Sequence, residues 1–358
     1  MVLLPALIRG DAVMKRRGSF ALILSMLVAT FSVRMAATEH PDLTGERLVV
    51  YISFHEEEGR RLLDLFQVRT NVDYTYLRIP TGELVARVIK EASAPQAHII
   101  LGGTADAHQL LANEGLLEKY VPSPAEHIFE KFRSPDHYWT GIYLGAISIG
   151  INENRWKREF EGQGVEKPST FEDLLNPRFK GEIILPDPRT SGTGYTLLAS
   201  LIQLWGEDEA FAYFRRLDQN VGEYTTTGFT VAQKTALGEY LIGINFIHDQ
   251  LLVKKSGFNL SSTIPPGAGW EIGCVSMIKN SQSSSAAKAF LDFMTDREAG
   301  QLHTNLTERI STRSDVMTPL GAKPWAEIPI NLDYDLYLAA KLKTKYLKGW
   351  EERVLRIN

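Results

Sequence analysis

The stretch YLGAISIGI, residues 143–151, alternates small and apolar side chains along its length. Successive side chains of a β-strand point to opposite faces, so this run predicts a long buried strand. Its length suits a strand that crosses from one domain into another. Shorter apolar runs and helical patterns alternate on both sides of it, and that order predicts an α/β fold with a largely parallel sheet.

The neighbouring elements follow from short apolar runs and from apolar residues at helical spacing. We expect strands over residues 48–52, 97–101, 181–185 and 271–278, and a strand-like run over 240–247 that ends at His248-Asp249. We expect helices over residues 55–68, after Thr81, from Ser191 to about Trp205, after Gly206 and over 283–294.

The amino end of the chain has the pattern of a cleaved secretory signal. A basic segment, Met14-Lys15-Arg16-Arg17, precedes an apolar stretch from Phe20 to Val33, and Met35-Ala36-Ala37 supplies small residues for signal peptidase. The apolar stretch is about 14 residues, short for a membrane span of about 20. We expect residues 1–37 to be a signal peptide, with residues 1–13 an upstream start artefact. The alternative is an amino-terminal anchor that is never cleaved.

Composition narrows the class of protein. After such a signal about 320 residues remain, enough for two domains of ordinary size. A net charge of -4 with no long basic block gives no support to binding of nucleic acid or of a membrane surface. Cys274 is the sole cysteine, so an intramolecular disulfide is excluded, and it lies too far from the signal to be a lipid-attachment site at the cleavage point.

Hydroxyl-bearing residues stand where an anion could bind. Ser191, Gly192 and Thr193 precede or begin an expected helix, whose amino terminus offers free N–H groups and partial positive charge. The alternative is that Ser191 only caps the helix. Thr226 lies in a second cluster, Thr225-Thr226-Thr227-Gly228, before another expected helix, and this cluster could equally be a polar turn.

Two further hydroxyls follow expected strands. Ser53 comes directly after the first strand and Thr104 after the second. Ligands of open α/β sheets collect at the carboxyl ends of strands, so both side chains are candidate ligand contacts. Either could instead be an ordinary capping residue.

A second group of polar residues has a different chemistry. His248, Asp249 and Glu271 can accept hydrogen bonds from sugar hydroxyls, and the imidazole can also donate. The alternative for His248-Asp249 is a surface pair at the exit of a strand. Trp270 could stack on a sugar ring, although a core position is the commoner fate of a tryptophan.

Short motifs follow one another in a particular order: VVYIS at 49–53, GGT at 102–104, PRFKG at 177–181, DPRTSGT at 187–193, NVGEYTTTG at 220–228 and GWEIG at 269–273. In this order and spacing the chain resembles the solute-binding proteins of bacterial ABC importers, specifically the type II group of ferric-iron-binding and hexose-phosphate-binding proteins. The resemblance covers nearly the whole chain after the signal. It implies a two-lobed periplasmic binding protein fold with hinge-crossing strands, which closes on a small ligand.

The resemblance also implies lobe boundaries and partners. Lobe 1 is expected over residues 38–145 and 266–358, with C-terminal helices that can pack on lobe 2, and lobe 2 over residues 146–265. The expected protein is a monomer in the periplasm that delivers a small phosphorylated ligand to an ABC permease, with no metal, cofactor or nucleic acid.

Three other functions compete with this one. In iron-binding relatives adjacent tyrosines stand where this chain has His248-Asp249, which counts against iron although His55, Glu57 and Tyr224 are hard donor types. An aminoalkylphosphonate is a closer competitor, because Asp249 and Glu271 could pair with an ammonium. An enzyme is disfavoured, because no Gly-x-Ser-x-Gly elbow, His-Glu-x-x-His motif or Walker loop occurs.

The expected ligand is a hexose phosphate, held at two ends. Its phosphate would be bound by Ser191, Gly192, Thr193 and Thr226, with Ser53 and Thr104 from the opposite lobe. The His-Asp pair and the glutamate of the Gly-Trp-Glu-Ile-Gly segment hold the sugar in the hexose-phosphate-binding relatives, so His248, Asp249 and Glu271 would select the sugar end. No arginine is assigned to the phosphate, which backbone N–H groups and hydroxyls can satisfy.

Overall fold

The computed structural model of the chain describes residues 40–281 and 284–355. The expected signal peptide, residues 1–37, and the suspected start artefact lie outside the described residues. Within the described ranges, no helix is both long enough and apolar enough to cross a membrane.

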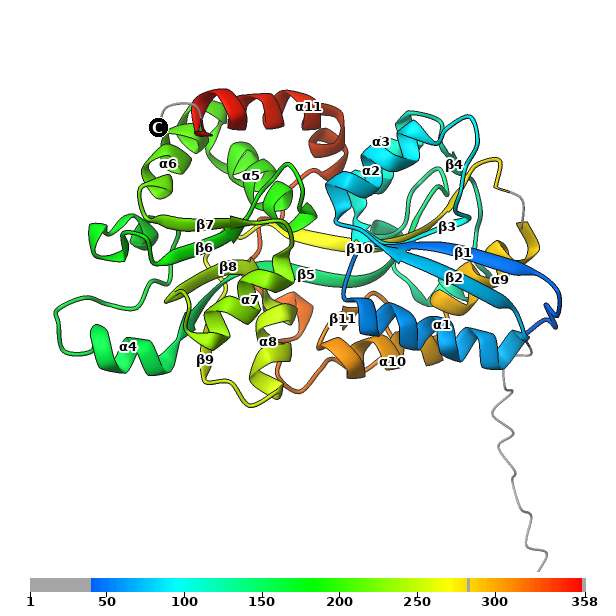
Figure 1. Cartoon of the computed structure of the whole chain (residues 1–358), viewed down its shortest axis with the longest axis horizontal. Coiled ribbons are helices and arrows are strands. Elements are labelled where there is room, and N and C mark those ends of the chain that lie inside the picture. The colour runs from blue at the N-terminus through cyan, green and yellow to red at the C-terminus, as the bar shows by residue number, and fades with distance from the viewer. Residues whose placement is uncertain (1–39, 282–283, 356–358) are drawn as a thin grey trace, which may run out of the picture. The chain divides into compact units, whose positions relative to one another are not determined.

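Strands and helices alternate along most of the chain, as the sequence predicts (Figure 1). The strands are β1 Arg47–Ile52, β2 Asp73–Arg78, β3 Ile99–Thr104, β4 Leu117–Glu118, β5 Thr140–Asn152, β6 Ile183–Pro186, β7 Val221–Thr225, β8 Ile242–Phe246, β9 Leu260–Thr263, β10 Trp270–Ile278 and β11 Ile310–Ser311. The helices are α1 Glu56–Thr70, α2 Thr81–Lys90, α3 Ala105–Asn113, α4 Glu153–Glu159, α5 Gly192–Trp205, α6 Glu207–Asp218, α7 Gly228–Leu237, α8 Ile247–Lys255, α9 Ser284–Met294, α10 Arg297–Thr307 and α11 Leu336–Arg353.

The strands follow one path in the order β2-β1-β3-β10-β5-β8-β6-β7. Strands β2, β1 and β3 are parallel, and so are β7, β6 and β8. We call these two groups, with the helices around them, the β1 half and the β6 half. Strands β5 and β10 between them are antiparallel to their neighbours. The predicted α/β class is confirmed, but a largely parallel sheet holds only within each half.

The long strand β5 joins the two halves. Its residues from Thr140 to Ala146 pair with β10 in the β1 half, and its residues from Ile147 to Asn152 pair with β8 and β9 in the β6 half. Every residue of β5 is buried, which is why its sequence is apolar or small throughout. Figure 1 shows β5 and β10 running through the middle of the molecule from one half to the other.

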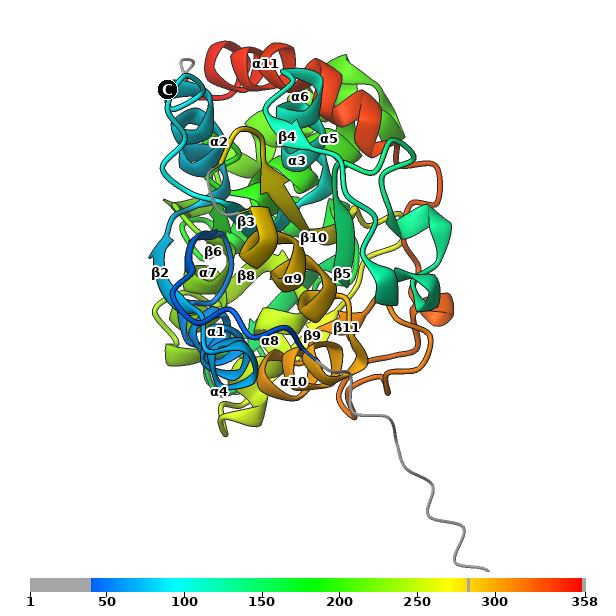
Figure 2. The ribbon, with the colours of Figure 1, turned by 90° about the vertical axis from the view of Figure 1, so that its right-hand side faces the viewer.

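Helices cover both faces of the sheet. In the end-on view, α2, α3 and α11 lie on one side of the central strands, and α1, α9 and α10 lie on the other (Figure 2). Each half has its own apolar core, with Phe66 and Phe290 buried in the β1 half, and Tyr195 and Phe211 buried in the β6 half. Each parallel group therefore has the two covered faces that such strands require.

The C-terminal helix α11 contacts both halves. Its Trp350 is buried in the core of the β6 half, and Tyr195 Oη of α5 donates a hydrogen bond of 2.5 Å to Ala339 O. Its Lys343 Nζ lies 3.0 Å from Asp106 Oδ2 of α3, in the β1 half, and both side chains are buried. The exact division of the chain into lobes stays a prediction.

Five strands were not predicted from the sequence: β2, β4, β7, β9 and β11. β2, Asp73–Arg78, pairs with β1, so the strand predicted as second in the chain is the third. β2 lies at the edge of the sheet and alternates exposed with half-exposed positions. Its sequence therefore lacks the apolar run that marks the predicted strands.

Candidate functional site

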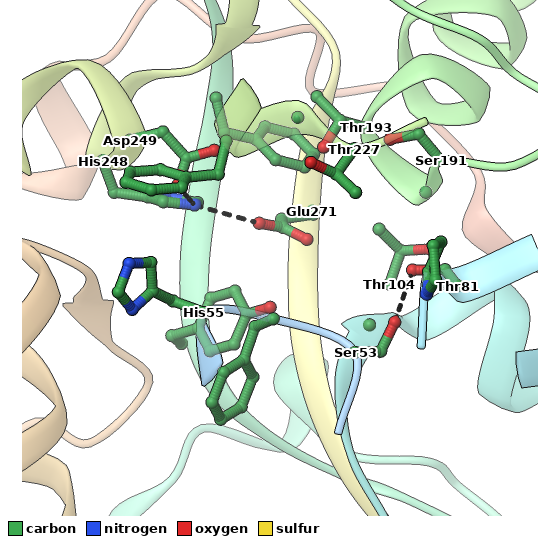
Figure 3. Close-up of a pocket in the computed structure, with 18 of the residues that line it drawn as sticks. Ser53, His55, Thr81, Thr104, Ser191, Thr193, Thr227, His248, Asp249 and Glu271 are labelled. Carbon is green, nitrogen blue, oxygen red and sulfur yellow. Dashed lines mark hydrogen bonds and ion pairs between the residues drawn. The ribbon is translucent and has the colours of Figure 1, made fainter. Parts of the chain in front are cut away.

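A cavity of about 500 Å³, which includes space open to solvent, lies between the two halves. Its wall brings together every residue that the sequence assigned to the phosphate or the sugar: Ser53, Thr104, Ser191, Gly192, Thr193, Thr226, His248, Asp249 and Glu271. Figure 3 shows the labelled hydroxyl groups gathered on one side and His248 with Asp249 on the other, with Glu271 between them. The cavity thus has two chemically different ends.

The hydroxyl end begins where parallel strands of the β1 half stop. Ser53 follows β1 and Thr104 ends β3, and these neighbouring strands deliver their side chains to the same edge of the sheet. Ser53 Oγ lies 2.8 Å from the hydroxyl of Thr81, the first residue of α2. Thr104 Oγ1 is buried and has no hydrogen-bond partner among the described residues. It is therefore free to bind a ligand oxygen.

The β6 half adds two helix amino termini to this end. Ser191 caps α5 by accepting a hydrogen bond of 3.4 Å from Gly194 N, and Thr227 caps α7 by accepting one from Thr230 N. Ser191 therefore does both things that its position allowed, because it caps the helix and also lines the cavity. The amino termini of α5, a helix of 14 residues, and of α7, a helix of 10 residues, face the same cavity, and each carries partial positive charge.

Gly192 permits the close approach of the two halves here. A Cβ at this position would lie 3.0 Å from Thr81 Oγ1 and 3.2 Å from Thr104 Oγ1. Any larger residue would displace the hydroxyls of the β1 half from the start of α5. Glycine is therefore required at position 192 because it leaves space for the hydroxyls of the β1 half.

His248 and Asp249 lie at the other end, and the prediction that they end a strand is wrong. Strand β8 stops at Phe246, and both residues belong to the first turn of α8. Both side chains are buried, so the alternative of a surface pair is excluded. A Cβ on Gly145 of β5 would lie 2.8 Å from the imidazole ring, so the small residue in this strand makes room for His248.

A buried cation that the sequence analysis missed stands behind this pair. Arg309 Nη1 lies 2.5 Å from His248 Nε2 and 3.9 Å from Glu271 Oε1, and its guanidinium lies 4.2 Å from the centre of the Tyr143 ring. A guanidinium only donates, so His248 Nε2 must accept, and the imidazole hydrogen is on Nδ1. This end of the cavity therefore carries a buried cation beside its acidic and polar groups.

Glu58 completes this network. It lies in the acidic first turn of α1, and it is buried and accepts a hydrogen bond of 3.3 Å from Arg309 Nε. It also contacts His303 Nδ1 and accepts a hydrogen bond of 3.0 Å from Thr307 Oγ1. Burial alone would raise the pKa of Glu58, but His303 and Arg309 hold it below its ordinary value. The carboxylate is therefore the ionised partner of Arg309.

Burial sets the protonation of the residues that face the ligand. Desolvation raises the pKa of Glu271 to about 8 and that of Asp249 to about 6, against the opposing effect of Arg309. Desolvation, together with Arg309 and His303, lowers the pKa of His248 well below its ordinary value. Near pH 7 this end therefore offers a neutral imidazole, a carboxylate and a protonated carboxyl group, which together can both donate and accept.

Other residues were placed differently from the sequence analysis. His55 was assigned to the first helix, but it precedes α1, lines the cavity and lies against Phe229 with ring centres 4.6 Å apart. Arg78 and Thr81 also line the cavity and were missed, because they flank the end of the unpredicted strand β2. Trp270 and Tyr224 are absent from the cavity wall: Trp270 packs on Trp325, and Tyr224 Oη donates to Asp218.

The chain can be compared with known proteins on this basis. The bacterial extracellular solute-binding protein family matches residues 94–315.

The chain belongs to this family.

Two solved members share its fold and about a third of its residues. The periplasmic binding protein AfuA from Actinobacillus pleuropneumoniae, solved with exogenous fructose-6-phosphate bound, is 31% identical to this solute-binding protein, with a TM-score of 0.83 over 87% of this chain and 99% of that chain. The periplasmic binding protein P5PA is 30% identical, with a TM-score of 0.81 over 86% and 99%. The fold is therefore that of type II periplasmic binding proteins, as the resemblance implied.

A sequence relative extends over nearly the whole chain. An uncharacterized protein of Haemophilus influenzae is 33% identical over 92% of this solute-binding protein and 97% of its own length. A match of this extent includes residues of both halves of the fold.

Proposed function

We propose that this solute-binding protein is the periplasmic component of an ABC importer and that it captures a hexose phosphate. Ser191, Gly192, Thr193, Thr226, Ser53 and Thr104 would hold the phosphate, and His248, Asp249 and Glu271 would select the sugar. The protein would act as a monomer, bind without changing its ligand and present it to a permease in the inner membrane.

One observation carries the proposal: the cavity joins two kinds of wall that match the two ends of such a ligand. Helix amino termini and hydroxyls suit a phosphate, which accepts several hydrogen bonds. The opposite wall mixes donors and acceptors, as ring hydroxyls require. Buried polar atoms on both walls, including Thr104 Oγ1, His248 Nδ1 and Glu271 Oε1, have no hydrogen-bond partner among the described residues. Such atoms are costly unless a ligand satisfies them.

The charge of the second wall favours hydroxyls over an ammonium group. Arg309 lies close to both Glu271 and His248, and it already balances part of the acidic charge. An ammonium placed beside Asp249 and Glu271 would meet this fixed cation as well. An aminoalkylphosphonate is therefore the weaker candidate at this end of the cavity.

The permease would recognise the form in which the two halves are closed over the ligand. The two halves are bridged by a hydrogen bond of 2.9 Å from Gly82 N in α2 to Thr190 O before α5, and by the contact of His55 with Phe229. A ligand that touches both walls stabilises this arrangement over an open one, which is a shift in population.

The test is a thermal-shift panel on mature protein that has been unfolded and refolded to remove carried-over ligand. The panel compares glucose 6-phosphate, fructose 6-phosphate, phosphate, glucose, aminoethylphosphonate and ferric citrate. Ligands that bind the native state raise the melting temperature. We expect stabilisation by the hexose phosphates and little by glucose or phosphate alone. A response only to aminoethylphosphonate or to iron would contradict the proposal, and release of inorganic phosphate on long incubation would reveal an enzyme.

A further inference from the structure

Arg78 is a cavity-lining cation whose charge no neighbouring carboxylate neutralises. It ends strand β2, three residues before Thr81, whose hydroxyl belongs to the phosphate end of the cavity. Its Nε donates a hydrogen bond of 3.2 Å to Phe54 O, and its other two guanidinium nitrogens have no hydrogen-bond partner among the described residues. No carboxylate of residues 40–281 or 284–355 lies within ion-pair distance of it, in contrast to Arg309, which pairs with Glu58.

The surroundings of Arg78 make an unpaired charge costly. The residue is partly buried, and it lines both the inner cavity and a groove outside the cavity mouth that includes Thr226, Thr227 and Phe229. Burial lowers the pKa of Arg78 from its ordinary value, and the more distant carboxylates of Glu56, Asp249 and Glu83 offset this only in part. A desolvated arginine with free donors is the usual partner of a phosphate or carboxylate, because its planar guanidinium can bond two oxygens at once.

We propose that Arg78 is the charge-compensating anchor of the ligand's phosphate and the residue that makes the site prefer a dianion over a monoanion. This inference rests on the proposed function and adds to it a specific cation that the hydroxyls and helix termini do not supply. Hydroxyls and the partial charges of helix termini discriminate only weakly between a monoanion and a dianion, whereas a full positive charge discriminates more strongly by net charge.

A pair of matched ligands separates charge from shape. At pH 8 a hexose 6-phosphate is a dianion, because the second pKa of a phosphate ester is about 6, whereas a hexose 6-sulfate of similar shape is a monoanion. The ratio of their dissociation constants, measured by calorimetry, reports the preference for the second charge. We expect the wild-type protein to bind the phosphate more tightly.

Substitution of Arg78 should then change this ratio. In Arg78→Gln we expect the affinity for hexose 6-phosphate to fall by about 10- to 100-fold and the phosphate-to-sulfate preference to fall by at least about 5-fold. Arg78→Lys retains the charge and should keep most of the preference despite weaker binding. The matched control is Arg60→Gln, which also removes a cation that lines the outer groove, but one paired with Glu57 and Asp64, each at 2.7 Å. It should leave the ratio within about 2-fold.

The outcomes distinguish this inference from the proposed function. If the wild-type protein prefers the phosphate and Arg78→Gln keeps the full preference while remaining folded by its melting temperature, the role of Arg78 is overturned and the proposed function stands. If Arg78→Lys loses the preference as completely as Arg78→Gln, charge is not what the residue supplies, which also overturns the inference. If the wild-type protein binds neither hexose ester, both the inference and the proposed function fail.

Discussion

The two ends of the cavity reach the same result, a polar binding surface, by opposite physical routes. The hydroxyl end uses neutral groups and helix amino termini, and the residues that form it, such as Ser191 and Thr104, come from motifs at the ends of strands and the starts of helices. The charged end is a buried network in which Glu58, His303 and Arg309 support His248 from behind. Burying an unpaired hydroxyl costs less free energy than burying an unpaired charge, and a buried charge must therefore be paired almost completely. The charged end is therefore the part of the site on which the stability of the protein also depends.

The largest expected effect is the loss of the buried counter-charge. Glu58→Ala leaves Arg309 in the interior without its carboxylate, and we expect the free energy of unfolding to fall by about 3–5 kcal/mol. The measurement is equilibrium denaturation by urea. The control is Glu57→Ala. The Glu57 carboxylate is half exposed and pairs with Arg60 and Arg61, and its loss should change the free energy of unfolding by less than about 1 kcal/mol. Equal losses in the two variants would show that the network is not the stabilising element.

The next effect concerns affinity rather than stability. The double variant Asp249→Ala with Glu271→Ala removes both acidic groups that face the ligand, and we expect hexose phosphate binding to weaken by about 100- to 1000-fold. Binding by calorimetry is the measurement, with Glu56→Ala at the cavity rim as control. Near-wild-type affinity for every sugar phosphate would end the division of the cavity into a phosphate end and a sugar end.

Of the two ends of the cavity, the charged end should contribute the dependence of stability on pH. Because burial raises the pKa of Glu271 to about 8, the folded protein holds this proton more tightly than the unfolded chain, where a glutamate titrates near 4.3. At this site the folded state thus binds more protons in this interval, and the contribution of Glu271 to the free energy of unfolding falls as pH rises from about 5 to 8. We expect Glu271→Gln to reduce this fall by on the order of 2 kcal/mol.

This pH effect is checked by urea denaturation of both proteins at pH 5.5, 7 and 8.5. Thr104→Val at the hydroxyl end serves as control, since it removes no titratable group and should leave the slope unchanged. A parallel slope in wild type and Glu271→Gln would mean that Glu271 titrates normally in the folded protein.

The smallest effect tests the hydroxyl end. Gly192→Ala adds a methyl group 3.0 Å from Thr81 Oγ1, and it should weaken hexose phosphate binding by about 10-fold by moving the opposing hydroxyls. The melting temperature should not drop, because alanine is the better helix former. A fall in stability with unchanged affinity would reverse the assignment and make Gly192 a packing residue.

The contrast between the ends also explains what the sequence could predict. Ser191, Gly192 and Thr193 form a contiguous motif at a helix start, and Ser53 and Thr104 follow recognisable strands, so local reasoning found them. Arg309 lies 61 positions from His248 and 251 from Glu58 along the chain, and nothing in its own neighbourhood marks it as a site residue. Such a cluster exists only through tertiary packing.

The fold was more accessible than the site. The run at 143–151 predicted the strand that joins the halves, and the helix from Ser191 to Trp205 was correctly bounded because Ser191 caps it and Gly206 follows it. The edge strand β2 was not predicted because none of its side chains is fully buried. Arg78, which ends this strand, was therefore not included in the predicted site. The end of β8 was misplaced because the first turn of α8 is as buried as the strand before it.

Strand β5 has a consequence for how the protein folds. One continuous strand supplies the hydrogen-bonding edge for β10 on one side of its midpoint and for β8 and β9 on the other. Cutting the chain between the halves would leave each fragment with half of a strand and an unpaired sheet edge. Such an edge can pair with another chain and so promotes aggregation. We therefore expect the two halves to unfold as a single cooperative unit.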